Sequence, residues 1–318
     1  MSPKIQQEGD LSSLPKKLCS KALVIFNPIA GSRRTVLVEK VVQELRLKGW
    51  QTSMIKTQKV GHAETIVLDL QRQKERIPDI LIVAGGDGTV NEVINGLSCI
   101  NRLDLPVALI PTGSVNLLAN EIMLPDNPKL LAEIISTSHV AKVVLGKIST
   151  ETESRIFLMT AGVGFDARAV RRLSKKLKTI VGRLAYIAAG IEEYFSGKRP
   201  SYQVTIDGKT ISAQSVLFAN GKYYAGRKIW AREASIKDQS LKVGVFANAG
   251  RLQIPLYAVA LFLGILARMP GIKIRTAKEV ELRSHSADPI QADGDIVAWL
   301  PARISVASGR ANLICPKP

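Results

Sequence analysis

The sequence predicts an α/β + β protein, in which an N-terminal Rossmann-like α/β nucleotide-binding domain precedes a C-terminal antiparallel β-sandwich domain. In the first 140 residues, apolar β-rich runs alternate four times with helical patterns, as in a parallel sheet. Beyond about residue 140, β-runs follow one another with few long helices. The chain has 318 residues and is 46% hydrophobic, which is enough for two buried cores.

The composition favours anionic partners and a reducing compartment. Lys and Arg number 44 against 27 acidic residues, a net charge of +17, so the surface should attract nucleotides, nucleic acid or acidic lipid headgroups. Aromatic residues make up only 5% and are not interleaved with the basic ones, which argues against a nucleic-acid surface. The three cysteines, Cys19, Cys99 and Cys315, are far apart, so neither a disulfide framework nor a metal cluster is expected.

Four strand–loop–helix units make up the predicted nucleotide domain, residues 19–139, after a polar lead-in, residues 1–18, that is expected to be disordered. The four strands are expected at Lys21–Phe26, Thr52–Thr57, Ile80–Ala84 and Val107–Ile110. Such units predict a parallel sheet whose loops gather at one edge, where open α/β sheets bind ligands. The candidate ligand residues at or near the strand ends are Asn27, Gly31, Thr57, Gly85, Gly86, Asp87, Gly88, Thr89, Val90, Asn91, Gly113, Ser114 and Asn116.

The loop after the third strand is the centre of this prediction. Gly85, Gly86 and Gly88 can take positive φ and approach a ligand closely, and free N–H groups at the start of the next helix suit a phosphate. Asp87 is anionic, so a cation, Mg²⁺ above all, or a polarised hydroxyl is expected between it and the phosphates. The other interpretation is a glycine turn in which Asp87 caps the helix.

The second domain, residues 140–307, is predicted from short β-runs joined by turn pairs such as Asp207-Gly208. The segment from Asp288 to Asp295 contains three carboxylates and predicts a hairpin turn when taken alone. The β-runs are Val140–Ile148, Arg155–Ala161, Tyr202–Ile206, Ser215–Ala219, Leu241–Phe246, Val280–Leu282 and Ile304–Ala307.

Two helical segments interrupt the β-runs, and both leave two interpretations open. The pattern from Arg168 to Leu184 is amphipathic and basic, so it would lie either on an anionic membrane or as a solvated face packed on the sheet. The segment from Ile254 to Pro270 has an apolar core too short to span a bilayer, so it is either buried or interfacial. Arg251, Arg268, Lys273 and Arg275 flank this second segment.

Six ordered motifs resemble the diacylglycerol-kinase-type lipid kinases, which include sphingosine kinases and bacterial soluble diacylglycerol kinases. The resemblance covers nearly the whole chain from Lys21 onward. It implies an active site between two domains, with a C-terminal strand, about residues 308–318, that returns to the first domain. The motifs are Asn27-Pro28-x-x-Gly31, Gly85-Gly86-Asp87-Gly88-Thr89-x-Asn91, Pro111-x-Gly113-Ser114-x-Asn116, Thr160-Ala-Gly-Val-Gly164-Phe-Asp166, Ala219-Asn220 and Asp293-Gly294-Asp295.

The resemblance also implies roles for particular residues. Thr57, the segment from Gly85 to Asn91 and Ser114 would contact ATP, and Asp87 would position the nucleotide and Mg²⁺. Asp295 stands where the family has the glutamate that is the proposed catalytic base, and aspartate offers the same chemistry. Asp238 is retained near the position where bacterial members bind a structural Mg²⁺, although Gln239 replaces the usual glycine.

The predicted function is therefore ATP-dependent phosphorylation of a membrane lipid hydroxyl, with diacylglycerol giving phosphatidic acid as the first choice. The protein would be cytoplasmic and would associate peripherally with an anionic membrane surface, without nucleic acid as a partner. Bacterial relatives often form dimers, so a homodimer is one open oligomeric state. Two alternatives are a soluble-acceptor kinase of the NAD-kinase or phosphofructokinase type and a non-catalytic nucleotide- or lipid-binding protein.

Overall fold

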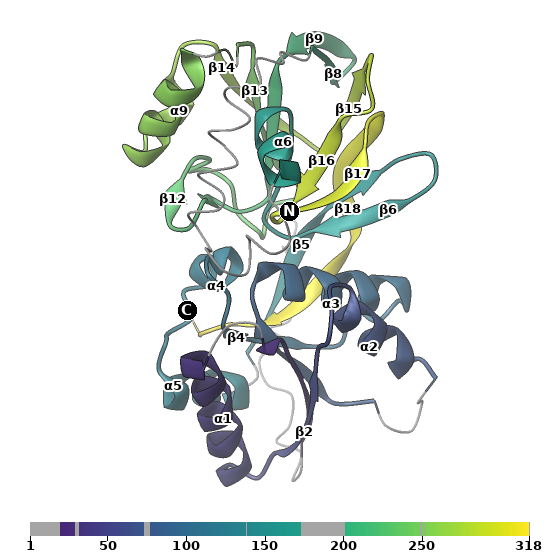
Figure 1. Ribbon diagram of the computed structural model, residues 1–318. Helices are drawn as coiled ribbons and strands as arrows, with labels where there is room; N and C mark the ends of the chain where they lie inside the picture. The colour runs from purple at the N-terminus through teal and green to yellow at the C-terminus, as the bar shows by residue number, and fades with distance from the viewer. Residues whose placement is uncertain are drawn as a thin grey trace, which may run out of the picture.

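The computed structural model describes residues 20–28, 32–72, 77–137, 139–172, 201–248, 250 and 252–317, arranged as two halves stacked one above the other (Figure 1). The predicted disordered lead-in lies outside the described residues. So does most of the predicted basic helix, of which only α6 (Phe165–Arg172) is described.

The N-terminal half is a parallel sheet covered by helices on both faces. Its strands lie in the order β2-β1-β3-β4, where β1 is Lys21–Phe26, β2 Gln51–Lys56, β3 Ile80–Gly85 and β4 Val107–Pro111. Every residue of β3 is buried, because an apolar core lies on each face of the strand. Helices α1 (Ser32–Leu47) and α5 (Pro128–Thr137) cover one face, and α2 (His62–Leu70) and α3 (Asp87–Cys99) cover the other.

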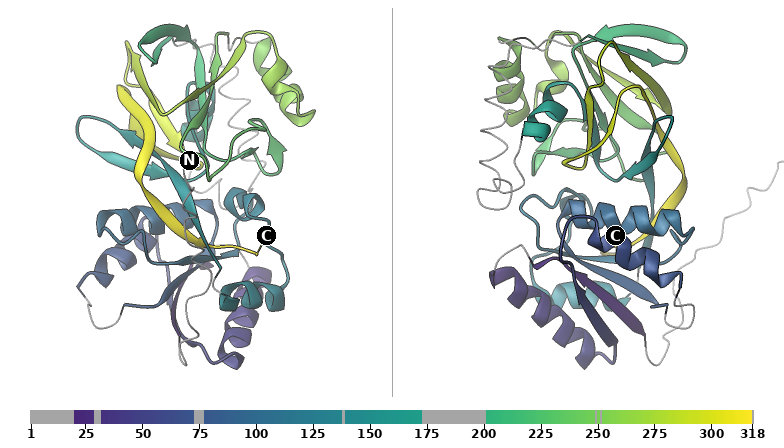
Figure 2. Two further views of the ribbon diagram at one scale, coloured as in Figure 1. Left: turned by 180° about the vertical axis from the view of Figure 1, so that it is seen from behind. Right: turned by 45° about the vertical axis from the view of Figure 1, so that its right-hand side comes forward.

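This sheet continues into the C-terminal half through the long strand β18 (Ala302–Ile314) (Figure 2). Leu313 of β18 lies parallel to Val107 of β4, and the strand then pairs antiparallel with β15 (Glu279–Ser284) and β5 (Val140–Ser149). Strand β6 (Ser154–Phe157) pairs with β5, while β8 (Tyr202–Ile206) and β9 (Lys209–Ala213) complete the far edge. The two halves therefore share one sheet, and the domain boundaries given above remain a prediction.

A second, antiparallel sheet packs on the far half of the first, which confirms the predicted β-sandwich. Buried side chains such as Tyr202, Phe218 and Ile304 fill the space between the two sheets. In the described part of the chain the strand order is β14 (Ile272–Ala277), β13 (Leu241–Phe246), β10 (Ser215–Ala219), β7 (Thr160–Val163), β16 (Pro289–Ala292) and β17 (Asp295–Trp299).

The prediction of one strand over Arg155–Ala161 was wrong. The segment forms two strands that belong to different sheets, β6 in the first and β7 in the second. The chain crosses between them at Leu158 and Met159, whose N–H groups bond to the Asp293 carboxylate instead of to a neighbouring strand. A side chain that lies far along the sequence therefore ends the first strand.

Both predicted Asp-Gly hairpins are confirmed. Asp207 and Gly208 have φ of 49° and 74°, and Asp293 and Gly294 have φ of 48° and 92°. Positive φ at both central residues is the geometry of the tight turn that best suits twisted antiparallel strands. The second hairpin fixes the direction in which Asp295 leaves the turn at the start of β17.

Helix α9 (Gln253–Phe262) and the 3-10 turn η3 (Leu266–Arg268) replace the single long helix suggested by residues 254–270. Gly264, with φ of 70°, lies between them. Tyr257 and Ala260 are buried against the second sheet, whereas other apolar residues of α9 are exposed. None of the described helices combines the length and the apolar character needed to cross a membrane.

Candidate active site

The glycine loop at the end of β3 leads directly into α3. Gly85 is the last residue of the strand, Gly86 caps the helix with φ of −94°, and the helix begins at Asp87. The prediction of positive φ at Gly85, Gly86 and Gly88 was wrong, because none of them has it. The glycines are needed for close packing instead: a Cβ at Gly85 would lie 2.6 Å from the Cβ of Thr89.

Three separate segments meet at this loop without room for a side chain. A Cβ on Gly113 would lie 2.4 Å from the Cα of Gly86 and 2.5 Å from Oδ1 of Asn116. A Cβ on Gly88 would lie 3.1 Å from Oδ2 of Asp295. The glycine loop, the loop after β4 and the hairpin of the second sheet thus form one cradle, with the exposed Asp295 carboxylate over the first turn of α3.

Asp87 caps α4 (Leu117–Glu121), the helix after the neighbouring loop. Its Oδ2 accepts the N–H of Leu117 at 2.9 Å and its Oδ1 accepts the N–H of Leu118 at 3.1 Å. Burial raises the pKa of the Asp87 carboxyl from 3.8 to about 6, although these two hydrogen bonds lower it. Capping was the alternative interpretation of Asp87, but the capped helix is a different one from the helix that contains it.

This raised pKa predicts a pH-dependent contribution to stability. Below about pH 4 the protonated carboxyl stabilises the fold relative to the unfolded chain, and this advantage is lost as the pH rises through 6. The free energy of unfolding of the wild type, minus that of Asp87→Asn, should fall by about 2 kcal/mol between pH 4 and pH 7 when both are measured by urea unfolding with EDTA present. Asp69→Asn, at an exposed site, is the control, and a difference that stays constant for Asp87→Asn would contradict the prediction.

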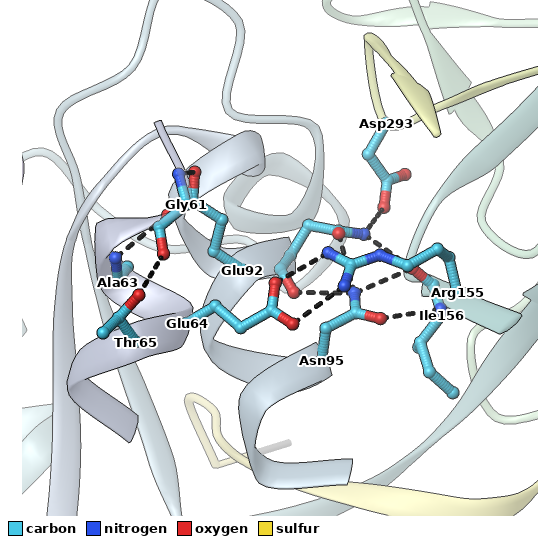
Figure 3. A network of polar contacts seen from close by, with 10 residues as sticks. Gly61, Ala63, Glu64, Thr65, Glu92, Asn95, Arg155, Ile156 and Asp293 are labelled. Atoms are coloured by element: carbon cyan, nitrogen blue, oxygen red, sulfur yellow. Dashed lines mark hydrogen bonds and ion pairs between the residues drawn. The ribbon is translucent and has the colours of Figure 1, made fainter. Parts of the chain in front are cut away.

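Glu92 of α3 holds the loop that leads into α2, on the other side of α3 from α4 (Figure 3). Its two carboxylate oxygens accept the N–H groups of Gly61 and Ala63, at 2.9 and 3.0 Å, at the start of α2. Burial raises the pKa of Glu92, and the nearby Asp295 carboxylate adds to this shift. Helix α3 therefore uses Asp87 and Glu92 to cap a helix on each side, which fixes the loops at the sheet edge around it.

Asn91 and Asn95 tie α3 to the C-terminal half. Asn91 donates to the carbonyl of Ile156 at 2.9 Å and to Oδ2 of Asp293 at 2.8 Å. Asn95, one turn later, donates to the Ile156 carbonyl at 3.1 Å and accepts the Ile156 N–H at 2.9 Å. The buried Asn91 side chain, predicted to contact the nucleotide, is thus used to join the two halves.

Asp293 completes this junction from the hairpin side. Besides Asn91, its carboxylate accepts the N–H groups of Leu158, Met159 and Thr160 at 2.7 to 3.0 Å. Burial raises the pKa of Asp293 in spite of these four hydrogen bonds. Because Asp295 follows two residues later in the same tight turn, the junction also sets the position of Asp295 above the glycine loop.

Arg155 and Glu64 form an ion pair between β6 and α2 that also joins the halves. Nη1 and Nη2 of Arg155 each lie 2.8 Å from a carboxylate oxygen of Glu64, and the two side chains are 28% and 18% exposed, respectively. In a double-mutant cycle with Arg155→Ala and Glu64→Ala, the coupling energy should be about 1–2 kcal/mol by chemical unfolding. The exposed pair Arg303–Glu281 should give less than about 0.5 kcal/mol, and equal values for the two pairs would contradict the prediction.

The remaining predicted residues divide into four groups. Asn27 donates to Oγ1 of Thr89 at 3.1 Å, and Thr57 lies buried just after β2, so these residues are at the predicted edge. Val90 offers no side chain to a ligand, because it packs in the core beneath the sheet. Asp238 is exposed in the loop before β13, far along the chain from the cradle, and Gly31 lies outside the described residues.

The loop after β4 offers polar atoms to a ligand. Asn116 has φ of 51° and donates to the carbonyl of Gly113 at 2.8 Å, while its Oδ1 is buried without a hydrogen-bond partner. Oγ1 of Thr112 is likewise buried without a partner, and Ser114 is exposed on the same loop. The hydroxyl of Thr112 could donate to a phosphate, whereas Oδ1 of Asn116 accepts and would need a donor or a cation such as Mg²⁺ between it and the phosphates.

Magnesium fits this site with few protein ligands. No cluster of three or more His, Cys, Asp or Glu side chains that could hold a metal occurs among the described residues. Mg²⁺ is commonly held by one or two carboxylates together with substrate phosphates. Asp87 keeps lone pairs beyond its two amide hydrogen bonds and is the carboxylate of the loop itself.

Several residues of the site were not singled out from the sequence. Arg34 of α1 donates to the carbonyl of Thr112, and Gln291 donates to Oδ2 of Asp166 at 2.6 Å while accepting the N–H of Gly294 at 3.1 Å. Glu92 and Asn95 hold the loops as described above. Asn91 and Asn95 are four residues apart, and this spacing in the sequence indicates that the two side chains lie on the same face of a helix.

Comparison with known proteins agrees with this architecture. Residues 21–148 match the diacylglycerol kinase catalytic domain, and residues 159–315 match the YegS C-terminal NAD kinase beta sandwich-like domain. The chain is 28% identical over 304 residues to a diacylglycerol kinase of Staphylococcus carnosus (strain TM300), covering 93% of this chain and 95% of that protein. It is 29% identical over 287 residues to one of Staphylococcus saprophyticus, covering 88% and 90%.

The fold also matches a solved structure. A diacylglycerol kinase from Bacillus anthracis str. Sterne superposes with a TM-score of 0.72 at 22% identity, over 93% of this chain and 97% of that one. At this identity the likeness concerns the fold alone.

Proposed function

Since the chain belongs to the diacylglycerol kinase catalytic domain family, we propose that it is a lipid kinase that transfers the γ-phosphate of ATP to the hydroxyl of a membrane lipid. Diacylglycerol, which would give phosphatidic acid, is the first candidate substrate. The protein would act in the cytoplasm, at the surface of an anionic membrane, where its net charge of +17 favours binding.

One observation carries the proposal: the Asp295 carboxylate lies beside the glycine loop that would hold the phosphates. A Cβ on Gly88 would come within 3.1 Å of Oδ2 of Asp295, although the two residues are more than 200 positions apart. Phosphoryl transfer to a hydroxyl needs a site that holds the phosphates and, close to it, a carboxylate that can accept the proton of the hydroxyl.

In the proposed reaction, Asp295 accepts the proton of the lipid hydroxyl as its oxygen attacks the γ-phosphorus. The bond between the γ-phosphorus and the bridging oxygen breaks, and ADP leaves with the electron pair. Backbone N–H groups at the start of α3 face the phosphates, and the rigid junction of Asn91 and Asp293 keeps Asp295 in place. Mg²⁺, held by the phosphates and Asp87, would supply charge stabilisation.

Transfer of labelled γ-phosphate from MgATP to lipids in detergent mixed micelles tests the proposal. The panel contains diacylglycerol, a sphingoid base and an isoprenoid alcohol, and we expect at least one labelled lipid. NAD belongs in the same panel, because residues 159–315 match a domain described as NAD kinase beta sandwich-like. Labelling of NAD alone would favour a soluble-acceptor kinase, and ATP binding without any labelled product would favour a non-catalytic binder.

A further inference from the structure

Helix α9 exposes an apolar face that the fold leaves uncovered. Six of the fifteen large apolar side chains that are exposed in the described part of the chain fall between residues 252 and 265. Leu252, Phe262 and Leu263 are 84%, 69% and 68% exposed. We define the α9 face as Leu252, Leu256, Val259, Phe262 and Leu263, which recur at helical spacing.

The opposite side of α9 explains why this face points outward. Tyr257 and Ala260 are buried with Phe246 and Leu266 in a small core, and the Tyr257 hydroxyl donates to the carbonyl of Pro270 at 3.3 Å. Since this inner side anchors the helix, the α9 face cannot turn inward without breaking that core. Figure 1 shows α9 at the outer edge of the second sheet, beside the edge strand β14.

Positive charge surrounds the α9 face without any acidic residue in its stretch of chain. From Gln239 to Lys278 the sequence contains six Lys or Arg and no Asp or Glu. Arg268, Lys273 and Arg275 are exposed on η3 and β14. Lys228 of β12 (Lys228–Ile229) places its Nζ 4.4 Å from the centre of the Phe262 ring.

This combination identifies the chemistry of the partner. We propose that the α9 face inserts into the headgroup region of an anionic lipid bilayer while the surrounding cations contact lipid phosphates. The apolar side chains of a helix face gain free energy when they are buried at the boundary between the lipid headgroups and the acyl chains. Each nearby Lys or Arg adds about 1 kcal/mol of attraction to an anionic surface. The two together make stable peripheral binding, whereas a protein partner would need acidic side chains to match this rim.

The surface is connected to the candidate active site through the hairpin of β11 (Tyr223–Tyr224) and β12. Strand β12 lies beside α9, and Arg227 in the turn before it donates to Oδ1 of Asn120 in α4 at 3.1 Å. The N–H groups that begin α4 are those capped by Asp87. The inference rests on the proposed function in this respect: docking through α9 would bring the bilayer to the side of the molecule where α4 meets the nucleotide loop.

Sedimentation with sucrose-loaded vesicles tests the proposal. The wild type should bind vesicles of phosphatidylcholine with phosphatidylglycerol much more tightly than phosphatidylcholine alone. Phe262→Ser combined with Leu263→Ser should weaken binding to the anionic vesicles by about tenfold or more. The control Leu47→Ser with Leu130→Ser, two exposed residues of the N-terminal half, should bind as the wild type does.

A second double variant tests the contribution of the cations. Arg268→Gln combined with Lys273→Gln should weaken binding to anionic vesicles about tenfold and leave binding to neutral vesicles unchanged. Wild-type vesicle binding by the Phe262 and Leu263 variant would overturn the proposal. So would light scattering without vesicles in which that variant turns a dimer into a monomer, since the face would then join two copies.

Failure of the proposed function is distinguishable, because phosphorylation in mixed micelles needs no bilayer. If no lipid is labelled in micelles while vesicle binding depends on the α9 face, the kinase proposal fails and the docking proposal stands.

Discussion

Asp295→Asn is expected to lower kcat for lipid phosphorylation by about 10²- to 10⁴-fold, the usual contribution of a general base. The asparagine amide keeps the size of the side chain at the end of the hairpin but cannot accept the hydroxyl proton. The affinity for MgATP should change little, because an ionised carboxylate only accepts hydrogen bonds and so makes none to the phosphates. Radiolabel transfer to a micellar lipid measures kcat, and calorimetry measures nucleotide binding.

Two further variants make this result specific. Asp295→Glu should retain much of the activity, since it restores a carboxylate and lengthens it by one methylene. Asp207→Asn changes an exposed aspartate in the turn between β8 and β9, outside the cradle, and should leave kcat unchanged. If Asp295→Asn kept wild-type kcat, Asp295 would have no role as base, and the general base would have to be sought among other groups at the cradle.

Gly113→Ala is expected to weaken MgATP binding by about tenfold or more and to lower the free energy of unfolding by about 1–3 kcal/mol. The new Cβ would lie 2.4 Å from the Cα of Gly86, and both atoms belong to the backbone or are fixed to it. The loop after β4 must therefore move away from the glycine loop, which opens the cradle. Calorimetric titration with MgATP and urea unfolding measure the two effects.

Gly49→Ala separates the loss of nucleotide binding from a general loss of stability. Gly49 has φ of 86°, so alanine there is strained by about 1 kcal/mol, but no heavy atom lies within 4 Å of the new Cβ. This variant should lose stability and keep its affinity for MgATP. Unchanged nucleotide affinity in Gly113→Ala would show that close contact between the two loops is not required.

The strands of the fold could be predicted wherever local pattern decides them. Ile80–Ala84 is a continuous apolar run because both faces of β3 are buried, and Asp293-Gly294 forms a tight hairpin because those two residue types tolerate positive φ. The break between β6 and β7 could not be predicted. It depends on the Asp293 carboxylate, which accepts three backbone N–H groups from residues more than 130 positions earlier.

In the candidate site, too, contacts between residues far apart in the sequence could not be predicted. Its place at the C-terminal ends of the parallel strands follows from topology, and glycine-rich loops in the sequence were enough to locate it. The partners of Asp87 and Glu92 were not visible, because each carboxylate caps a helix about thirty residues away. A sequence motif therefore located the loop, while only the fold could show that its acidic residues hold neighbouring loops together.

The shared sheet affects how this protein can fold during synthesis. Strand β18 occupies the place beside β4 in the N-terminal sheet, but a ribosome makes it nearly 200 residues after β4. Until then the nascent N-terminal half has an unpaired strand edge where Leu313 will bind, and such an edge invites pairing with other chains. Completion of the nucleotide half must therefore wait until β18 has left the ribosomal tunnel, so the two halves are expected to reach their native state together.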